Sequence, residues 1–255
     1  MPRAAEKFLA RTDPEVSEWG IVPPAANHAH RHLILILASA FGAIVLWSGW
    51  APWHRQDWWL ENLLALLSLP VLWLIYRYVR FPRLSWILVF LFLSVHELGA
   101  HFTYSEVPYN AWWQSLTGRS FNSLVGWDRN NFDRIIHVLY GLLLAPPLRH
   151  IAEQWVKTRG IWTYVLPVEM TLSTSALYEL IEWAAATIFG GELGVAYVGT
   201  QGDPWDAQKD IALATAAALA VMLGSLLADW KSHPGFARDL VDSLRTTHQK
   251  SLDRR

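Results

Sequence analysis

The stretch LILILASAFGAIVLWSGW occupies residues 33–50 and contains no charged side chain. As a helix it would be about 27 Å long, close to the roughly 30 Å thickness of a bilayer's hydrocarbon core. Further apolar stretches of similar length follow it, at Leu60–Val79, Leu84–Phe102, Phe132–Leu148, Val168–Phe189 and Ala207–Ala228. Because lipid offers no hydrogen-bonding partners, a spanning backbone must satisfy its own polar groups, as a helix does. The sequence therefore predicts an all-α fold, a polytopic six-helix transmembrane bundle.

The composition agrees with a membrane protein. Of the 255 residues, 53% are hydrophobic and 17% are charged, whereas a soluble domain has about 25% charged residues. These values exclude a disordered chain, a collagen and a disulfide-rich scaffold. The net charge of −1 gives no reason to expect a nucleic-acid partner. The chain has no Cys, which excludes thiolate metal ligands and a Cys nucleophile.

The distribution of Lys and Arg predicts the orientation. Three parts are expected: an N-terminal segment at 1–32, a transmembrane domain at 33–230 and a C-terminal tail at 231–255. If both termini lie on one side, that side holds 16 of the 21 Lys and Arg residues. The positive-inside rule then places both termini in the cytoplasm. The first 32 residues are too long and too acidic for the start of a cleavable signal, so the first span is expected to be retained.

Aromatic residues mark the expected membrane surfaces. Tryptophans cluster at the span ends, which is typical of an interfacial belt in contact with the lipid bilayer. The longest outer connection runs from Thr103 to Asn131. Within it, VPYNAWWQSL at residues 107–116 is predicted to form a short helix in the interface.

The position of the acidic and histidine residues is the main indication of function. Four predicted helices each carry a pair of such residues three or four positions apart, and this spacing puts both on one helix face. The pairs are Glu97 with His101, Asp133 with His137, Glu179 with Glu182, and Asp206 with Asp210. All four lie toward the outer side of the membrane. A charge inside a span costs at least about 2.5–3.5 kcal/mol, so such residues usually face a cavity, a partner or an ion.

Carboxylate–His pairs facing inward are how helical bundles hold metal ions. The predicted metal ligands are Glu97, His101, Asp133, His137, Glu179, Asp206 and Asp210. Residues expected to support them, or to act as general acid or base, are His96, Glu182 and Asp203. Oxygen and nitrogen donors favour Zn, Fe or Mn, with Mg or Ca suitable if His is not a direct ligand. The run HELGAH at residues 96–101 is not the zinc-protease motif HExxH, because its second His comes one position late.

Several functions stay open at this point. A metal site on the periplasmic side would suit hydrolysis of a lipid or envelope substrate, and the helix pairing would also suit a redox di-iron site. A proton-coupled or ion transporter needs polar groups across the whole membrane, but Glu169 is the one clear acid near the inner ends of the spans. A structural polar network, neutralised by Arg129, Arg134 and Lys209, is the third alternative. The sequence does not indicate the oligomeric state.

Four stretches resemble a known family. They are HELGAHFTYSEVPY from His96, RNNFDRIIH from Arg129, SALYELIEW from Ser175 and GTQGDPWDAQKD from Gly199. In them the chain resembles the YjdF-type bacterial inner-membrane proteins, a family defined as a domain of unknown function. The resemblance implies a multi-pass protein of the bacterial inner membrane and implies no particular reaction.

Overall fold

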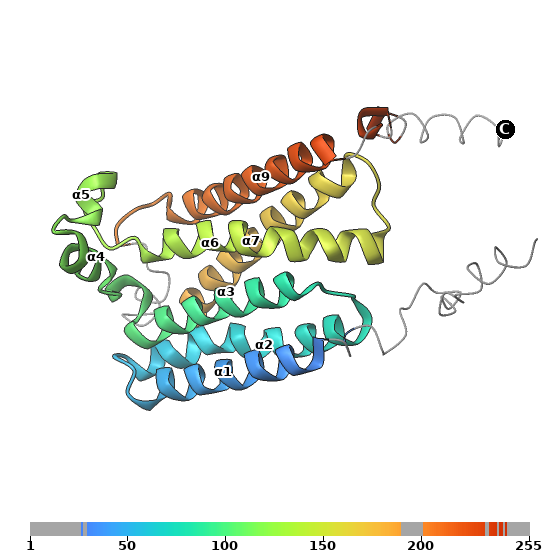
Figure 1. Cartoon of the computed structure of the whole chain (residues 1–255). Helices are drawn as coiled ribbons and strands as arrows, with labels where there is room; N and C mark the ends of the chain where they lie inside the picture. Colours follow the sequence, from blue (N-terminus) through green and yellow to red (C-terminus); the bar gives the residue numbers. More distant parts are fainter. Residues whose placement is uncertain are drawn as a thin grey trace, which may run out of the picture.

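The computed structural model describes residues 27, 30–189, 201–232, 235–238, 240–241 and 243. All regular structure within these residues is helical (Figure 1). Six long helices form the body: α1 (Arg31–Trp50), α2 (Arg55–Tyr78), α3 (Arg83–Phe102), α6 (Phe132–Ile151), α7 (Trp162–Phe189) and α9 (Asp206–Ser232). Four short elements connect them: η2 (Tyr104–Glu106), α4 (Tyr109–Thr117), α5 (Phe121–Val125) and the π-helical turn η3 (Ala152–Val156).

Five of the long helices are apolar and long enough to cross a membrane: α1, α2, α3, α6 with η3, and α9. Of the six predicted transmembrane helices, five are therefore candidate membrane spans by length and composition. The remaining long helix, α7, has 28 residues and runs beside α6 and α9 (Figure 1). It carries three acids, Glu169, Glu179 and Glu182, which lower its hydropathy. Its crossing of the membrane stays a prediction.

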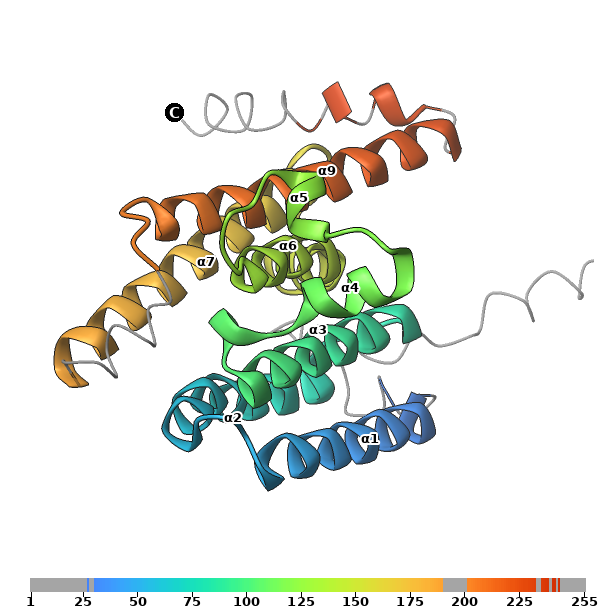
Figure 2. The same ribbon diagram turned by 90° about the vertical axis from the view of Figure 1, so that its left-hand side faces the viewer.

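The long helices run alternately up and down, so α1 begins and α9 ends at the same end of the bundle (Figure 1). Helices α1–α3 form one group and α6, α7 and α9 the other, with α3 packed on α6 between them (Figure 2). Close approach of α6 and α9 depends on small residues. A Cβ on Gly141 would overlap the backbone oxygen of Ala214 and lie 2.8 Å from Ala217 Cβ. Small residues at such crossings let membrane helices pack backbone to backbone.

The observed helices begin earlier than the apolar stretches predicted. Helix α2 starts at Arg55 instead of Leu60, and α7 starts at Trp162 instead of Val168. In α2 the added residues 55–59 are partly polar, and helix propagation into such a flank costs little once a turn exists. The short helix predicted at 107–116 is observed as α4, and its place in the membrane interface stays a prediction. The N-terminal segment at 1–32 and the tail at 231–255 fall largely outside the described residues.

Helices α4 and α5 lie at the end of the bundle where α6 and α9 begin (Figure 1), here called the α4–α5 end. Side chains hold this layer to the start of α6. Tyr109 donates a hydrogen bond to Asn122 and accepts one from the backbone N–H of Asn131. Asn130 donates to the backbone oxygen of Val107. The layer thereby positions the polar first turn of α6, from which the candidate site is built.

Candidate intramembrane carboxylate and histidine site

Three of the predicted ligands meet near the α4–α5 end. Asp133 and His137 lie one turn apart on α6, and Asp210 lies opposite them on α9. One ligand atom from each residue lies within 4.8 Å of the other two. His137 is 5% exposed and Asp210 is 1% exposed, and Asp210 Oδ1 has no hydrogen-bond partner. The predicted i,i+4 face of α6 is therefore turned toward α9.

Helix α7 adds a fourth predicted ligand to this cluster. Glu179 Oε1 lies 3.2 Å from His137 Nε2, and Asp133 Oδ1 lies 3.7 Å from the same nitrogen. The other ring nitrogen of His137 lies 3.3 Å from Ser175 Oγ. A His that binds a metal through one nitrogen usually makes a hydrogen bond through the other. We refer to Asp133, His137, Glu179 and Asp210 as the central cluster.

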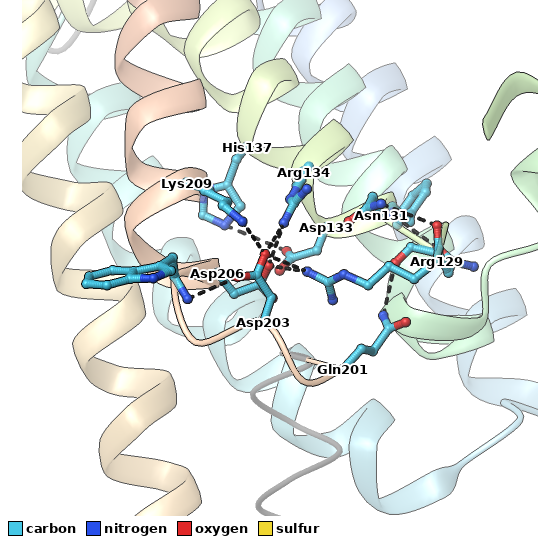
Figure 3. Close-up of polar contacts among 12 residues, drawn as sticks. Arg129, Asn131, Asp133, Arg134, His137, Gln201, Asp203, Asp206 and Lys209 are labelled. Carbon is cyan, nitrogen blue, oxygen red and sulfur yellow. Dashed lines mark hydrogen bonds and ion pairs between the residues drawn. The ribbon is translucent and has the colours of Figure 1, made fainter. Parts of the chain in front are cut away.

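An ion-pair layer covers the central cluster toward the α4–α5 end (Figure 3). Arg129 is paired with Asp206, and Arg134 lies 3.1 Å from Asp206 and 2.7 Å from Asp203. Lys209 lies 2.5 Å from the same oxygen of Asp203. Both acids of this layer therefore have cationic partners. Asp206 and Asp203, predicted as a ligand and as a supporting residue, lie in this layer rather than in the central cluster.

Asp203 also lies just before the last helix, α9. Its carboxylate accepts a hydrogen bond from the backbone N–H of Trp205, just before α9 begins at Asp206. The hydrogen bond from Lys209, together with that from Trp205, lowers the pKa of the Asp203 carboxyl to about 2. The carboxylate therefore stays charged at neutral pH, as suits a residue that lies against three cations, Arg129, Arg134 and Lys209.

A second group of buried acids lies on the other side of Asp133. A cavity of about 20 Å³ is lined by residues of α2, η2, α6 and α7, with Asp57, Glu61, Asp133 and Glu182 as acids alongside Asp206. Glu61 is 6% exposed and Glu182 is 5% exposed. Glu61 Oε2 has no hydrogen-bond partner. Asp133 thus borders both the central cluster and this cavity.

His96 supports the same region through its two ring nitrogens. Its Nδ1 lies 2.5 Å from the Tyr104 hydroxyl, and its Nε2 lies 3.3 Å from the backbone oxygen of Glu61. The Glu61 carbonyl oxygen can only accept, so Nε2 of a neutral His96 donates to it and Nδ1 accepts from the Tyr104 hydroxyl. His96 then carries its proton on Nε2 and holds α2 to α3.

The structure does not bring Glu97 and His101 into the central cluster. They share one face of α3, as their spacing predicts, but that face is turned to α1. Ser48 donates a 2.5 Å hydrogen bond to Glu97 Oε2, and His101 Nδ1 lies 2.9 Å from the Ser48 backbone oxygen. His101 also stacks on Trp47 with ring centroids 4.4 Å apart. Spacing along one helix says nothing about which neighbour that face meets, and only packing settles it.

Glu61 is the main residue that the sequence analysis missed. The signal was present, because Asp57 and Glu61 are four residues apart and form a fifth pair of the same kind. The predicted second apolar stretch begins at Leu60, which leaves Asp57 outside it. Since α2 begins at Arg55, both acids lie on one helix. Ser175 and Tyr104 were also missed as partners, since neither spacing nor residue type sets them apart from other hydroxyl residues.

Sequence comparison gives the family. Residues 33–229 match the model of a family described as "Predicted membrane protein (DUF2238)". The chain belongs to this family of membrane proteins. It is also 29% identical over 181 residues to "Inner membrane protein YjdF" of Escherichia coli (strain K12). The aligned region covers 71% of this chain and 82% of that protein. No solved structure matches the chain. The resemblance to the YjdF-type proteins is confirmed, and the matched region contains every residue of the central cluster.

Proposed function

We propose that this family member is an inner-membrane protein that binds a divalent cation in its central cluster, near the periplasmic surface. The observation that carries the proposal is the meeting of Asp133, His137 and Asp210 within 4.8 Å. Asp210 adds an independent argument, because its Oδ1 is buried without a partner. A buried carboxylate oxygen without a partner lowers the stability of the fold, and a bound cation would offset this free-energy cost.

The donor set fits such an ion. Two carboxylates and an imidazole suit Zn, Fe or Mn, and Glu179 stands 3.2 Å from the imidazole as a further oxygen donor. Ser175 Oγ lies within hydrogen-bonding distance of Nδ1, the other ring nitrogen of His137. The cations of the layer above, Arg134 and Lys209, are already paired with acids of that layer.

The cavities around the cluster support a proposal for the substrate class. An apolar-walled cavity of about 160 Å³ reaches Asp133 and His137 and is also lined by Phe92, Tyr140 and Tyr178. A second cavity of about 230 Å³ shares Phe92 and Tyr140 with it and continues between α2 and α6 toward Ile75 and Ile151. An apolar path through a membrane bundle is suited to a lipid chain. The proposed substrate is therefore a lipid or an envelope compound that carries a lipid anchor.

Hydrolysis is the chemistry that this arrangement suits best. A divalent cation polarises an ester or phosphoryl oxygen and activates water at neutral pH. The chain's own residues would orient the ion through His137 and Ser175, and a pocket of about 340 Å³ lined by Asp133, Glu179 and Asp210 would admit the water. A transporter is less well supported, because the walls of the cavity that extends toward Ile75 and Ile151 are apolar.

Metal analysis of the detergent-purified full-length protein tests the proposal. We expect a bound divalent metal that Asp210→Asn and His137→Ala each remove, while Asp128→Asn, an exposed acid near the same end, leaves it in place. A folded wild-type protein without metal, whose melting temperature does not respond to a chelator, would contradict the cation site and favour a structural network.

A further inference from the structure

Two cavities beside the central cluster form one continuous path. The outer cavity, of about 160 Å³, reaches Asp133 and His137. The inner cavity, of about 230 Å³, continues to Ile75 and Ile151. The residues that line both cavities are Leu64, Phe92, His96 and Tyr140. The polar cluster is therefore joined to an apolar recess that runs toward the opposite end of the bundle.

The inner cavity ends against packed apolar side chains. Ile75 and Phe81, which line it, belong to a buried core cluster, and Ile151 packs against that cluster. Ile151 lies 14 residues beyond His137 on α6, a distance of about 21 Å along a helix. Half of a bilayer's hydrocarbon core is only about 15 Å thick. The path is therefore longer than one leaflet is thick, and its far end meets the core of the bundle.

The walls of the inner cavity offer no polar side chain without a partner among the described residues. The lining residues with polar side chains are Ser68, His96 and Tyr140. Ser68 donates to a backbone oxygen of its own helix, and the Tyr140 hydroxyl is hydrogen-bonded to Thr174. Both ring nitrogens of His96 are engaged, as described above. An apolar occupant fits such a cavity, whereas water and ions need polar partners.

The outer cavity suits an uncharged polar group. Its lining residues, all of them described, include no Lys or Arg. A phosphate placed there would lie beside Asp133 without a cationic side chain on the same wall, and an unpaired buried charge is unfavourable. A carboxylic ester carries no net charge. It can therefore enter this cavity and place its carbonyl oxygen at the ion proposed beside His137.

We infer that the two cavities bind one acyl chain of an uncharged ester lipid, with the ester beside His137 and the terminal methyl group at Ile75 and Phe81. This inference rests on the proposed function for the ion at the ester end, and it names the substrate class of that site. The chain has one direction, because the polar cluster lies at one end of the path only. Lipids of the leaflet nearer the α4–α5 end already point this way, since their headgroups lie outside the hydrocarbon core.

Photo-cross-linking tests the site and its direction. The metal content of full-length protein in dodecylmaltoside is measured first, and a chelator is then added so that the probe is not hydrolysed. Both probes are palmitoyl monoacylglycerols, one with a diazirine at the end of the chain and one with a diazirine next to the ester. We expect the first to label peptides with Ile75 or Ile151, and the second to label peptides with Tyr140 or Tyr178. Unlabelled monopalmitoylglycerol should compete better than palmityl phosphate.

Leu144→Trp is the variant that fills the path. Leu144 lines the inner cavity, so the larger side chain should abolish labelling at Ile75 and Ile151 by the end-of-chain probe. Leu142→Trp is the matched control on the same helix, because Leu142 is exposed and lines neither cavity. It should be labelled like the wild type. Should Leu144→Trp fail to fold, as judged by gel filtration, Leu72→Trp on the α2 wall replaces it with the same expectation.

The outcomes separate this inference from the proposed function. Directional labelling of protein purified without metal would keep the chain site and contradict the cation site. Bound metal without labelling in the cavities would keep the cation site and contradict the chain site. Labelling of the same peptides by both probes, or labelling that Leu144→Trp leaves unchanged, would overturn the inference, because lipid then covers the helices without a fixed direction. Equal competition by palmityl phosphate would overturn the ester as the substrate class.

Discussion

His137 Nε2 on α6 lies 3.2 Å from Glu179 Oε1 on α7. This contact joins residues 42 positions apart in the chain, and it ties the central cluster to α7. The imidazole therefore has carboxylates from α6, α7 and α9 around it. The contact also gives the first prediction.

Glu179→Gln should weaken metal binding without removing it. The variant keeps the size of the side chain but loses the charge beside the imidazole, and substitutions at such supporting positions lower metal affinity about 10–100-fold. Competition with a chelator of known affinity measures the change. Glu169→Gln on the same helix is the matched control, because Glu169 is exposed. Equal affinity of the two variants would rule out a role for Glu179.

Ser48→Ala should lower stability and leave the metal content unchanged. Ser48 is the buried residue of α1. It donates to Glu97 and accepts a 3.0 Å hydrogen bond from Trp58 Nε1. Loss of both bonds leaves buried polar groups unpaired, which costs about 1–3 kcal/mol. Thermal unfolding in detergent measures the effect, with the exposed Ser39→Ala as control. Loss of metal from Ser48→Ala would return Glu97 and His101 to the list of candidate ligands.

Gly141→Val should separate α6 from α9. The added side chain would overlap the Ala214 backbone oxygen, and backbone cannot rotate aside as a side chain can. Overpacking of this kind costs about 1–3 kcal/mol. Because α9 carries Asp210, metal binding should also weaken. Gly224→Val is the control, since nothing lies within 4 Å of a Cβ built there. Equal melting temperatures for both variants would show that the close approach is not needed.

The ion-pair layer should lose strength in acid. Lys209 and Trp205 lower the pKa of Asp203 to about 2, below the value of about 3.9 in an unfolded chain. A lowered pKa means that the stabilisation is complete above about pH 3.9 and is lost as the pH falls toward about 2. The difference in melting temperature between wild type and Asp203→Asn should therefore be constant from pH 7 to about 5 and shrink below pH 4. A difference that persists at about pH 2 would exclude this origin.

Reporter fusions test the orientation. The excess of Lys and Arg predicts that both termini lie in the cytoplasm, so a reporter after Val107 should give a periplasmic signal. A reporter after Arg159, between α6 and α7, should give a cytoplasmic one. The second fusion also tests whether α6 crosses fully, since that segment lies at the opposite end of the bundle (Figure 1). The reverse pattern would invert the protein and place the central cluster near the cytoplasm.

Part of the candidate site was predictable because it depends on short-range geometry. Asp133 and His137 share a face because they are four residues apart. In the structure Asp133 Oδ1 lies 3.7 Å from His137 Nε2. The same rule put Glu97 and His101 on one face, yet that face meets α1. The rule gives the relative direction of two side chains on one helix. It does not give the rotation of that helix against its neighbours.

The amino-acid sequence alone determined where the long helices lie, because hydropathy and backbone hydrogen bonding act over neighbouring residues. It also determined which residue types were available as ligands. Tertiary packing alone decided that Asp210 meets His137, 73 positions before it in the chain, and that Asp206 pairs with arginines instead. The reason is that helix rotation and separation depend on contacts such as Gly141 with Ala214, which arise between segments distant in the chain.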